Sequence, residues 1–212
     1  MAEELETVSY SEENIRHLSD VDHIRTRPGM YIGRMGDGSH AEDGIYVLLK
    51  EAIDNSIDEF RMHEGNRIEI DITDNKSITL RDYGRGIPQG KMIEAVSQLN
   101  TGGKYDSKAF KKSVGMNGVG IKAVNFLSSR FEVRSYRDGN VRTAKFEKGI
   151  LVSDKTEKSS DERGTFISFE PDDTLFVNYS FHDDIVETML RNYTYLNTGL
   201  AIMYNGRRII SR

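Results

Sequence analysis

Three short turn signals each stand between two segments that have the composition of strands. Asp138-Gly139 separates FEVRSY from NVRTAKFEK, Asn205-Gly206 lies within AIMYNGRRII, and Asp74-Asn75 separates Arg67 to Thr73 from SITLRD. Asp-Gly and Asn-Gly are the dipeptides most favoured in two-residue hairpin turns. Ile68, Ile70 and Ile72 alternate as the inward side chains of a strand do. The sequence therefore predicts hairpins and a mostly antiparallel sheet.

The remaining segments add helices to this sheet. From about residue 41 to 62 the pattern is helical, with Leu49, Ile53, Ile57 and Phe60 at spacings of three and four. Further helices are expected at 91–99, at GIKAVNFLSS and at 179–197, and further strands at ILVSDKT and GTFISFEP, linked by the polar EKSSDER. HIRTRPGMYIG, residues 23–33, is expected to be a loop because proline and glycine interrupt it. The prediction is an α+β fold, a two-layer sandwich with helices on one face of a mixed, mostly antiparallel sheet.

Composition excludes several classes of protein. No apolar run approaches the roughly 20 residues that a membrane helix needs. The acidic start, MAEELETVSYSEENIRHLSD, lacks the apolar segment of a secretory signal. The absence of cysteine removes disulfides and thiol chemistry, and it fits a cytoplasmic protein. The formal net charge of −5 argues against binding of DNA by bulk electrostatics.

Glycines cluster in the middle of the chain, where eight of the nineteen fall between Gly84 and Gly120. Seven of these eight belong to DYGRGIP at 82–88, TGGK at 101–104 and GMNGVG at 115–120, the last leading into a predicted helix. Glycine lets a backbone approach a ligand closely, and backbone N–H groups at a glycine-rich helix start can bind phosphate. The P-loop pattern is absent, and no GxGxxG follows a first strand. Each motif taken singly is compatible with a flexible loop.

The helix predicted at 41–62 carries a cluster of acids and amides in EAIDNSIDEF, residues 51–60. At 3.6 residues per turn, Glu51, Asn55 and Asp58 share a narrow arc. One interpretation is a solvated acidic stripe, although asparagine and aspartate are poor helix formers and the arc has no Lys or Arg at i,i+4. The other interpretation is a nucleotide site. There an asparagine oxygen would hold Mg²⁺ beside phosphates, and a glutamate one turn away would orient a water for attack.

Taken together, these motifs resemble a known family. The acidic helix, DYGRGIP, TGGK with GMNGVG, and GTFISF follow in the order and spacing of the GHKL ATPases, which include type II topoisomerase B-subunits, Hsp90, MutL and sensor histidine kinases. HIRTRPGMYIG narrows the resemblance to the N-terminal ATPase domains of the B-subunits of bacterial gyrase and topoisomerase IV. The resemblance implies the GHKL fold over residues 10–212 after a flexible arm at 1–9, with ATP and Mg²⁺ as cofactors. The transducer and DNA-cleavage parts of that family are expected to lie outside this chain.

The resemblance also assigns roles to individual residues. Glu51 matches the catalytic glutamate that polarises the attacking water, and Asn55 matches the Mg²⁺ ligand. Asp82 matches the aspartate that accepts from the adenine 6-amino group, in a water network with Asp58, Gly86 and Thr165. Glu59 and Arg85 match a pair whose planar guanidinium lies over the adenine. Ile53, Ile87 and Pro88 would line the base pocket.

Other matches concern the phosphates, the partner subunit and inhibitors. The implied phosphate lid consists of Lys104, Gly115, Asn117, Gly118, Val119 and Gly120. Tyr10 matches an arm residue that reaches the partner subunit's nucleotide, and Arg137 matches a rim residue contacted, with Asp82 and Arg85, by aminocoumarin-type inhibitors. Two positions depart from the family: Tyr83 replaces the second aspartate of DDGRGIP and is expected beside the pocket, and Phe110 replaces a lid tyrosine.

The implied activity is that of an ATP-dependent type II DNA topoisomerase, in which ATP-driven closure of a B-subunit dimer is coupled to strand passage. The implied partners are a second B-subunit, an A-subunit in a heterotetramer, and DNA through the complete enzyme, without a membrane. DGIYVLLKEAIDNSIDEF and DYGRGIPQG look more like the topoisomerase IV branch, which relaxes and decatenates DNA. The gyrase B-subunit, whose complete enzyme supercoils DNA, is the alternative. More distant alternatives are a histidine kinase catalytic domain, an Hsp90-like nucleotide switch and a non-enzymatic scaffold.

Overall fold

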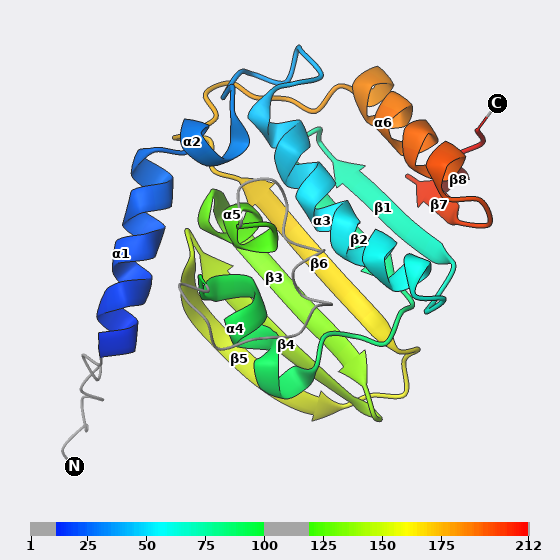
Figure 1. The fold of residues 1–212 in the computed structure, drawn as a ribbon, viewed down its shortest axis with the longest axis horizontal. Helices are drawn as coiled ribbons and strands as arrows, with labels where there is room; N and C mark the ends of the chain where they lie inside the picture. Colours follow the sequence, from blue (N-terminus) through cyan, green and yellow to red (C-terminus); the bar gives the residue numbers. More distant parts are fainter. Residues whose placement is uncertain (1–11, 100–118, 212) are drawn as a thin grey trace.

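The structure is a computed structural model that describes residues 12–99 and 119–211 (Figure 1). Within these ranges eight strands form one sheet in the order β5-β4-β3-β6-β2-β1-β7-β8. The strands are β1 (Arg67–Thr73), β2 (Ser77–Asp82), β3 (Ser128–Arg137), β4 (Asn140–Glu147), β5 (Ile150–Lys158), β6 (Gly164–Pro171), β7 (Ala201–Tyr204) and β8 (Arg207–Arg208). Neighbouring strands are antiparallel except β1 and β7, which are parallel. The predicted mixed, mostly antiparallel sheet is confirmed.

The hairpin turns have the backbone that their dipeptides predict. In the turns 74–75, 138–139 and 205–206, both residues have positive φ, between 47° and 78°. This is the conformation of a type I′ turn, whose twist matches that of the two strands it joins. The turns therefore fix the pairing of β1 with β2, β3 with β4 and β7 with β8.

The helices form the second layer of the fold. They are α1 (Glu12–Thr26), α2 (Gly29–Ile32), α3 (Gly44–Arg61), η1 (Gln89–Lys91, a 3₁₀ turn), α4 (Met92–Ser97), α5 (Ile121–Phe126) and α6 (Asp183–Leu196). In Figure 1, α3, α4 and α5 lie over the same face of the sheet, and α1 stands beside the part of the molecule that holds α5. This confirms the α+β sandwich. Among the described residues, none of the helices combines the length and apolar character that crossing a bilayer requires.

The core lies between α3 and the sheet. Ala52, Ile53 and Ile57 of α3 are buried, as are Ile70 of β1 and Leu80 of β2. Burial of each large aliphatic side chain stabilises the fold by about 1.5–3 kcal/mol. Ile53, expected in the base pocket, is 0% exposed and is a core residue in this structure.

The expectation of a loop at residues 23–33 is wrong. Helix α1 continues to Thr26, and α2 follows directly after Pro28. Proline suits the start of a helix because its missing N–H has no intrahelical partner there. The Nη1 atom of Arg25 donates to the carbonyl of Phe126 at 3.0 Å, which fixes the end of α1 against the end of α5.

Other boundaries also differ from the expectation, and among them the helix expected at 91–99 is α4 at Met92–Ser97, preceded by the 3₁₀ turn η1. Helix α3 begins at Gly44 rather than near residue 41, because the buried Asp43 is extended and its carboxylate accepts the N–H groups of Gly38 and His40. Helix α5 ends at Phe126 because β3 begins at Ser128. Helix α6 begins at Asp183 instead of residue 179, and β5 continues to Lys158.

Candidate functional site

Asp82 ends β2 and is almost completely buried, with 4% of its surface exposed. Its Oδ1 accepts the backbone N–H of Gly84 at 3.0 Å and that of Thr165 at 3.1 Å, and its Oδ2 accepts the Ser56 hydroxyl at 2.6 Å. Burial raises the pKa of Asp82, although the three hydrogen bonds act in the opposite direction. A β2 carboxylate is thus held between α3 and β6.

Ser56 was not among the residues singled out in the sequence. It lies on the buried side of α3, in phase with Ala52 and Ile53. A hydroxyl at an inward position of a helix needs a hydrogen-bond partner. That rule is the signal in the sequence that could have identified Ser56.

Thr165 contacts Asp82 through its backbone N–H rather than through its hydroxyl. It is 6% exposed, on the face of β6 that packs against the helices. Among the described residues, its hydroxyl makes no hydrogen bond, which leaves it able to join a water or ligand network.

Glu59 and Arg85 form the pair that the resemblance implied. Arg85 Nη2 lies 2.8 Å from Glu59 Oε1, while Arg85 Nε and the Arg85 backbone N–H donate to Oε2 at 3.2 and 2.9 Å. Burial alone would raise the pKa of Glu59, but the bonds from Arg85 outweigh it and lower the pKa. A Cβ on Gly84 would lie 2.8 Å from Glu59 Oε2, so glycine is needed for this approach.

The loop after Gly84 is attached to the β3–β4 hairpin. Gly86 has φ +79°, and a Cβ there would lie 2.9 Å from the carbonyl of Tyr136. Arg137 Nη1 donates to the Gly86 carbonyl at 3.0 Å, and the Ser135 hydroxyl donates to the Ile87 carbonyl. Ile87 is half-buried against the core, and Pro88 is exposed. The structure therefore places Arg137 beside this loop.

Glu51, Asn55 and Glu59 form a row along α3, at i, i+4 and i+8. This spacing corresponds to about 12 Å along the helix axis. One end of the row meets the loop through Arg85. At the other end, a Cβ on Gly120 would lie 3.8 Å from Glu51 Oε2, so Glu51 is close to the start of α5. Val119, just before Gly120, packs against the core.

Glu51 and the neighbouring Asp58 differ from Glu59 in the direction in which their pKa values are shifted. Burial, and then the charge of Asp54, raise the pKa of Glu51, while Lys50 acts in the opposite direction. The pKa of Asp58 is raised by the same two causes in the same order. Within residues 12–99 and 119–211, the side chains of Glu51, Asn55 and Asp58 make no hydrogen bond or ion pair. Asn55 is exposed.

These groups fit a magnesium ion bound together with phosphates. Mg²⁺ prefers oxygen ligands and takes only one or two from the protein at such sites. The exposed amide oxygen of Asn55 meets that need. In the described part of the chain, no three His, Cys, Asp or Glu residues are grouped so that they could hold a metal ion. Those residues therefore provide no site in which protein side chains alone coordinate a metal.

Several expected residues lie outside the described ranges, and their placement stays a prediction. They are Tyr10, Lys104, Gly115, Asn117 and Gly118, together with Phe110.

The expected place of Tyr83 beside the pocket is not what the structure shows. The ring of Tyr83 lies between the guanidinium groups of Arg67 and Arg81, 4.2 and 4.4 Å from them, and its hydroxyl donates to Glu69 at 3.0 Å. Glu69 alternates with the inward Ile68 and Ile70, so this cluster lies on the outer face of the sheet. Successive residues of an extended chain point to opposite faces, which separates Tyr83 from the Asp82 carboxylate.

Two hollows of the described residues do not include Glu51 or Asn55. A hollow of about 420 Å³ is lined by Arg67, Tyr83, Arg208 and their neighbours, near the outer cluster. The crevice that touches Ser56 and Asp82 has no room for a water molecule. Asp82 is therefore held by protein groups on that side.

At one end of the site, the Asp82 carboxylate is a fixed hydrogen-bond acceptor. At the other end, the half-buried Glu51 lies close to Gly120. A planar guanidinium beside the acceptor could cover an aromatic ring. A glutamate with a raised pKa, one turn from a free amide oxygen, could orient a water. The arrangement suits a ligand with a base at one end and charged groups at the other.

Comparisons with known proteins identify one matching family and several similar proteins. The family model described as "Histidine kinase-, DNA gyrase B-, and HSP90-like ATPase" matches residues 40–175. The B-subunit of DNA topoisomerase 4 from Borreliella burgdorferi is 54% identical over 201 residues, which cover 95% of this chain and 33% of the relative. The DNA gyrase B-subunit of Thermotoga maritima is 36% identical over 207 residues, covering 93% and 32%, and that of Rickettsia bellii is 35% identical over 216 residues, covering 97% and 26%. The chain thus spans at most 33% of the length of these relatives.

Proposed function

This chain belongs to the family of histidine kinase-, DNA gyrase B- and HSP90-like ATPases, and on that premise we propose that it is the ATP-binding and ATP-hydrolysing domain of a DNA topoisomerase IV B-subunit. The observation that carries the proposal is the row of Glu51, Asn55 and Glu59 on α3, which runs from the loop that follows Asp82 to the glycine before α5. The chain is 54% identical to a topoisomerase 4 subunit and 35–36% identical to the two gyrase subunits named above, and this difference favours the topoisomerase IV branch.

The adenine end of the site uses Asp82. The carboxylate accepts from the 6-amino group, with Gly86, Asp58 and the Thr165 hydroxyl in the surrounding water network. Arg85, held by two bonds from its side chain to Glu59, presents its guanidinium to the face of the base. Ile87 and Pro88 supply apolar contacts at the edge of the pocket.

The phosphate end uses Asn55 and Glu51. Asn55 holds Mg²⁺, which neutralises phosphate charge when bound. Glu51 orients the attacking water and accepts its proton, and the burial that raises its pKa makes it a better base. Val119 and Gly120 belong to the segment that covers the phosphates, together with Lys104, Gly115, Asn117 and Gly118.

In the complete protein, ATP binding drives closure of two B-subunits, with Tyr10 reaching the partner's nucleotide. An order–disorder element biased by the γ-phosphate is a common way to couple nucleotide state to assembly. The A-subunit and DNA are the further partners, and aminocoumarin-type inhibitors bind over Asp82, Arg85 and Arg137. Hydrolysis resets the closed dimer after strand passage.

Glu51→Ala tests the catalytic assignment in the complete enzyme. We expect loss of ATP turnover with ATP binding retained, because the variant removes the base and leaves Asp82 and Arg85 in place. Glu42→Ala, an exposed acid before α3, is the matched control and should change neither quantity. Retained turnover in Glu51→Ala with unchanged binding would refute the assignment.

Two further measurements test the binding mode and the branch. Asp82→Asn should weaken ATP binding measured by calorimetry, and unaltered affinity counts against the adenine contact. The complete enzyme with its A-subunit should decatenate linked DNA circles without introducing negative supercoils. ATP-dependent negative supercoiling would instead identify a gyrase.

A further inference from the structure

The hydrogen bonds to Asp82 limit where a ligand can reach its carboxylate. A carboxylate oxygen has about two lone-pair sites. Both sites of Oδ1 are used, by the N–H groups of Gly84 and Thr165 at 3.0 and 3.1 Å. Oδ2 accepts one bond, from the Ser56 hydroxyl at 2.6 Å. One site therefore remains, and it lies on the oxygen that Ser56 holds.

Ser56 has few ways to act other than through Asp82. It is 2% exposed, so its hydroxyl does not reach a ligand in the open part of the site. Its only hydrogen bond to another side chain among the described residues is the one to Asp82. The crevice beside the two residues has no room for a water, so in the unaltered protein the Ser56 hydroxyl, and not a solvent molecule, is the donor on this side of Asp82.

We propose that Ser56 is a positioning residue that sets the affinity for the 6-amino group of the nucleotide base by fixing the remaining acceptor site of Asp82. This inference rests on the proposed ATP-binding function and goes beyond it. The Ser56 hydroxyl holds the carboxylate plane in one rotation, so the free site of Oδ2 points in one direction. A base with an amino donor at this place is bound, and a base without that donor gains nothing from Ser56.

The proposal is tested by a double-mutant-type cycle, in which the Ser56 side chain of the protein and the 6-amino group of the ligand are removed separately and together. The ligands are the β,γ-imido triphosphates of adenosine and of purine riboside, which differ only in the 6-amino group. Each is titrated by calorimetry into the complete protein and into its Ser56→Ala variant. Ser128→Ala is the matched control, because the Ser128 hydroxyl is also buried but donates to the carbonyl of Val124 on α5.

We expect Ser56→Ala to weaken binding of the adenosine ligand about five- to tenfold, which corresponds to the net contribution of one typical hydrogen bond. Binding of the purine riboside ligand should stay within about twofold, since it lacks the donor. Ser128→Ala should leave the ratio of the two affinities unchanged. Ser56→Cys, which keeps the side-chain size with a weaker donor, should fall between wild type and alanine, and it decides the matter if the alanine variant does not fold.

Three results overturn the proposal or its premise separately. An equal loss for both ligands assigns Ser56 a purely structural role. No loss for either ligand shows that Asp82 is positioned without Ser56. Failure of the unaltered protein to bind either ligand contradicts the proposed ATP-binding function itself.

Discussion

Arg25 Nη2 lies 2.6 Å from Oδ2 of Asp172, an aspartate whose side chain is only 1% exposed. The same guanidinium donates through Nη1 to the carbonyl of Phe126, the last residue of α5. One side chain of the HIRTRP segment thus ties α1 both to the end of α5 and to the residue after β6. Since α5 begins beside Glu51, α1 is connected through one short helix to the candidate site.

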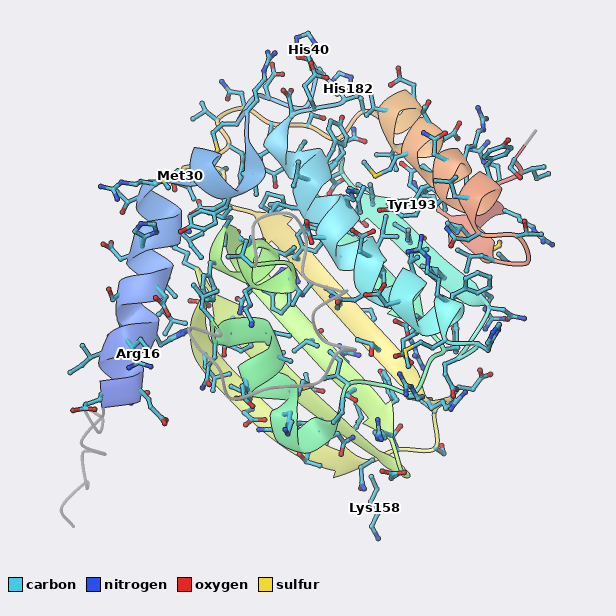
Figure 2. All side chains as sticks on the ribbon, in the orientation of Figure 1. Arg16, Met30, His40, Lys158, His182 and Tyr193 are labelled. Carbon is cyan, nitrogen blue, oxygen red and sulfur yellow. The ribbon has the colours of Figure 1, made fainter. Side chains whose placement is uncertain are left out.

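Replacement of Arg25 should destabilise the fold. Arg25→Ala leaves the buried Asp172 carboxylate with only its bonds from Thr174, and we expect a loss of about 2 kcal/mol in the free energy of unfolding. Urea denaturation measures this loss. Arg16→Ala, an exposed arginine on the same helix (Figure 2), should change the free energy by less than about 0.5 kcal/mol. Equal stability of the two variants would show that the Arg25 contact contributes nothing.

The Arg25–Asp172 contact should also shape the acid dependence of stability. Burial by itself raises the pKa of Asp172, but the bonds from Arg25 and Thr174 outweigh it and hold the pKa below its usual value. The stabilisation is therefore complete above the unfolded pKa of about 3.9 and is lost as the pH falls through the lower folded pKa. The advantage of wild type over Asp172→Asn should be constant from pH 7 to 5 and shrink below about pH 4. Asp173→Asn, at the exposed neighbour, should show no such change, and an advantage that persists unchanged to pH 2 contradicts the assignment.

Gly84 should be far less tolerant of alanine than Gly90, which lies in the 3₁₀ turn η1 that follows the loop. A Cβ at Gly84 would lie 2.8–2.9 Å from three atoms of Glu59, whereas nothing lies within 4 Å of a Cβ at Gly90. We expect Gly84→Ala to displace Glu59 from Arg85, costing about 1–3 kcal/mol in stability and weakening nucleotide binding. Gly90→Ala should be neutral or slightly stabilising. Denaturation measures the stability of each variant, and calorimetry measures its nucleotide affinity. Equal stability and affinity of the two variants would contradict the prediction and show that the loop moves to accommodate the added methyl group.

Tyr193 should stabilise the contact between α3 and α6. Its hydroxyl donates to Asp54 Oδ1 at 2.7 Å, and Figure 2 shows it between the two helices. Burial and then Asp54 raise the pKa of Tyr193, so the phenol stays protonated. Tyr193→Phe should lower the free energy of unfolding by about 1 kcal/mol. Tyr195→Phe, on the same helix but 70% exposed, is the control and should leave the free energy of unfolding unchanged. An equal loss in both variants would show that the bond from Tyr193 to Asp54 is not what stabilises the contact.

Local patterns were sufficient for much of the fold. The type I′ turns at 138–139 and 205–206 need only the backbone freedom of their own two residues, so their dipeptides predicted them directly. Helix α3 was predictable because its apolar spacing, from Leu49 to Phe60, repeats over about three turns. The loop expected at 23–33 failed because α1 buries only Val21 and Ile24, and its helix depends on docking through Arg25 more than on its own pattern.

The sequence by itself determined the hairpins and the acidic row on α3, because each depends on spacing within one segment. It also determined the residues matched to an ATPase, because that match depends on the order of motifs along the chain. Tertiary structure alone decided that Ser56 meets Asp82, 26 positions away, and that Arg25 meets Asp172, 147 positions away. Such pairings arise when separate elements pack, since buried polar groups must find partners wherever the assembled core offers them. No pattern within one helix or one strand contains that information.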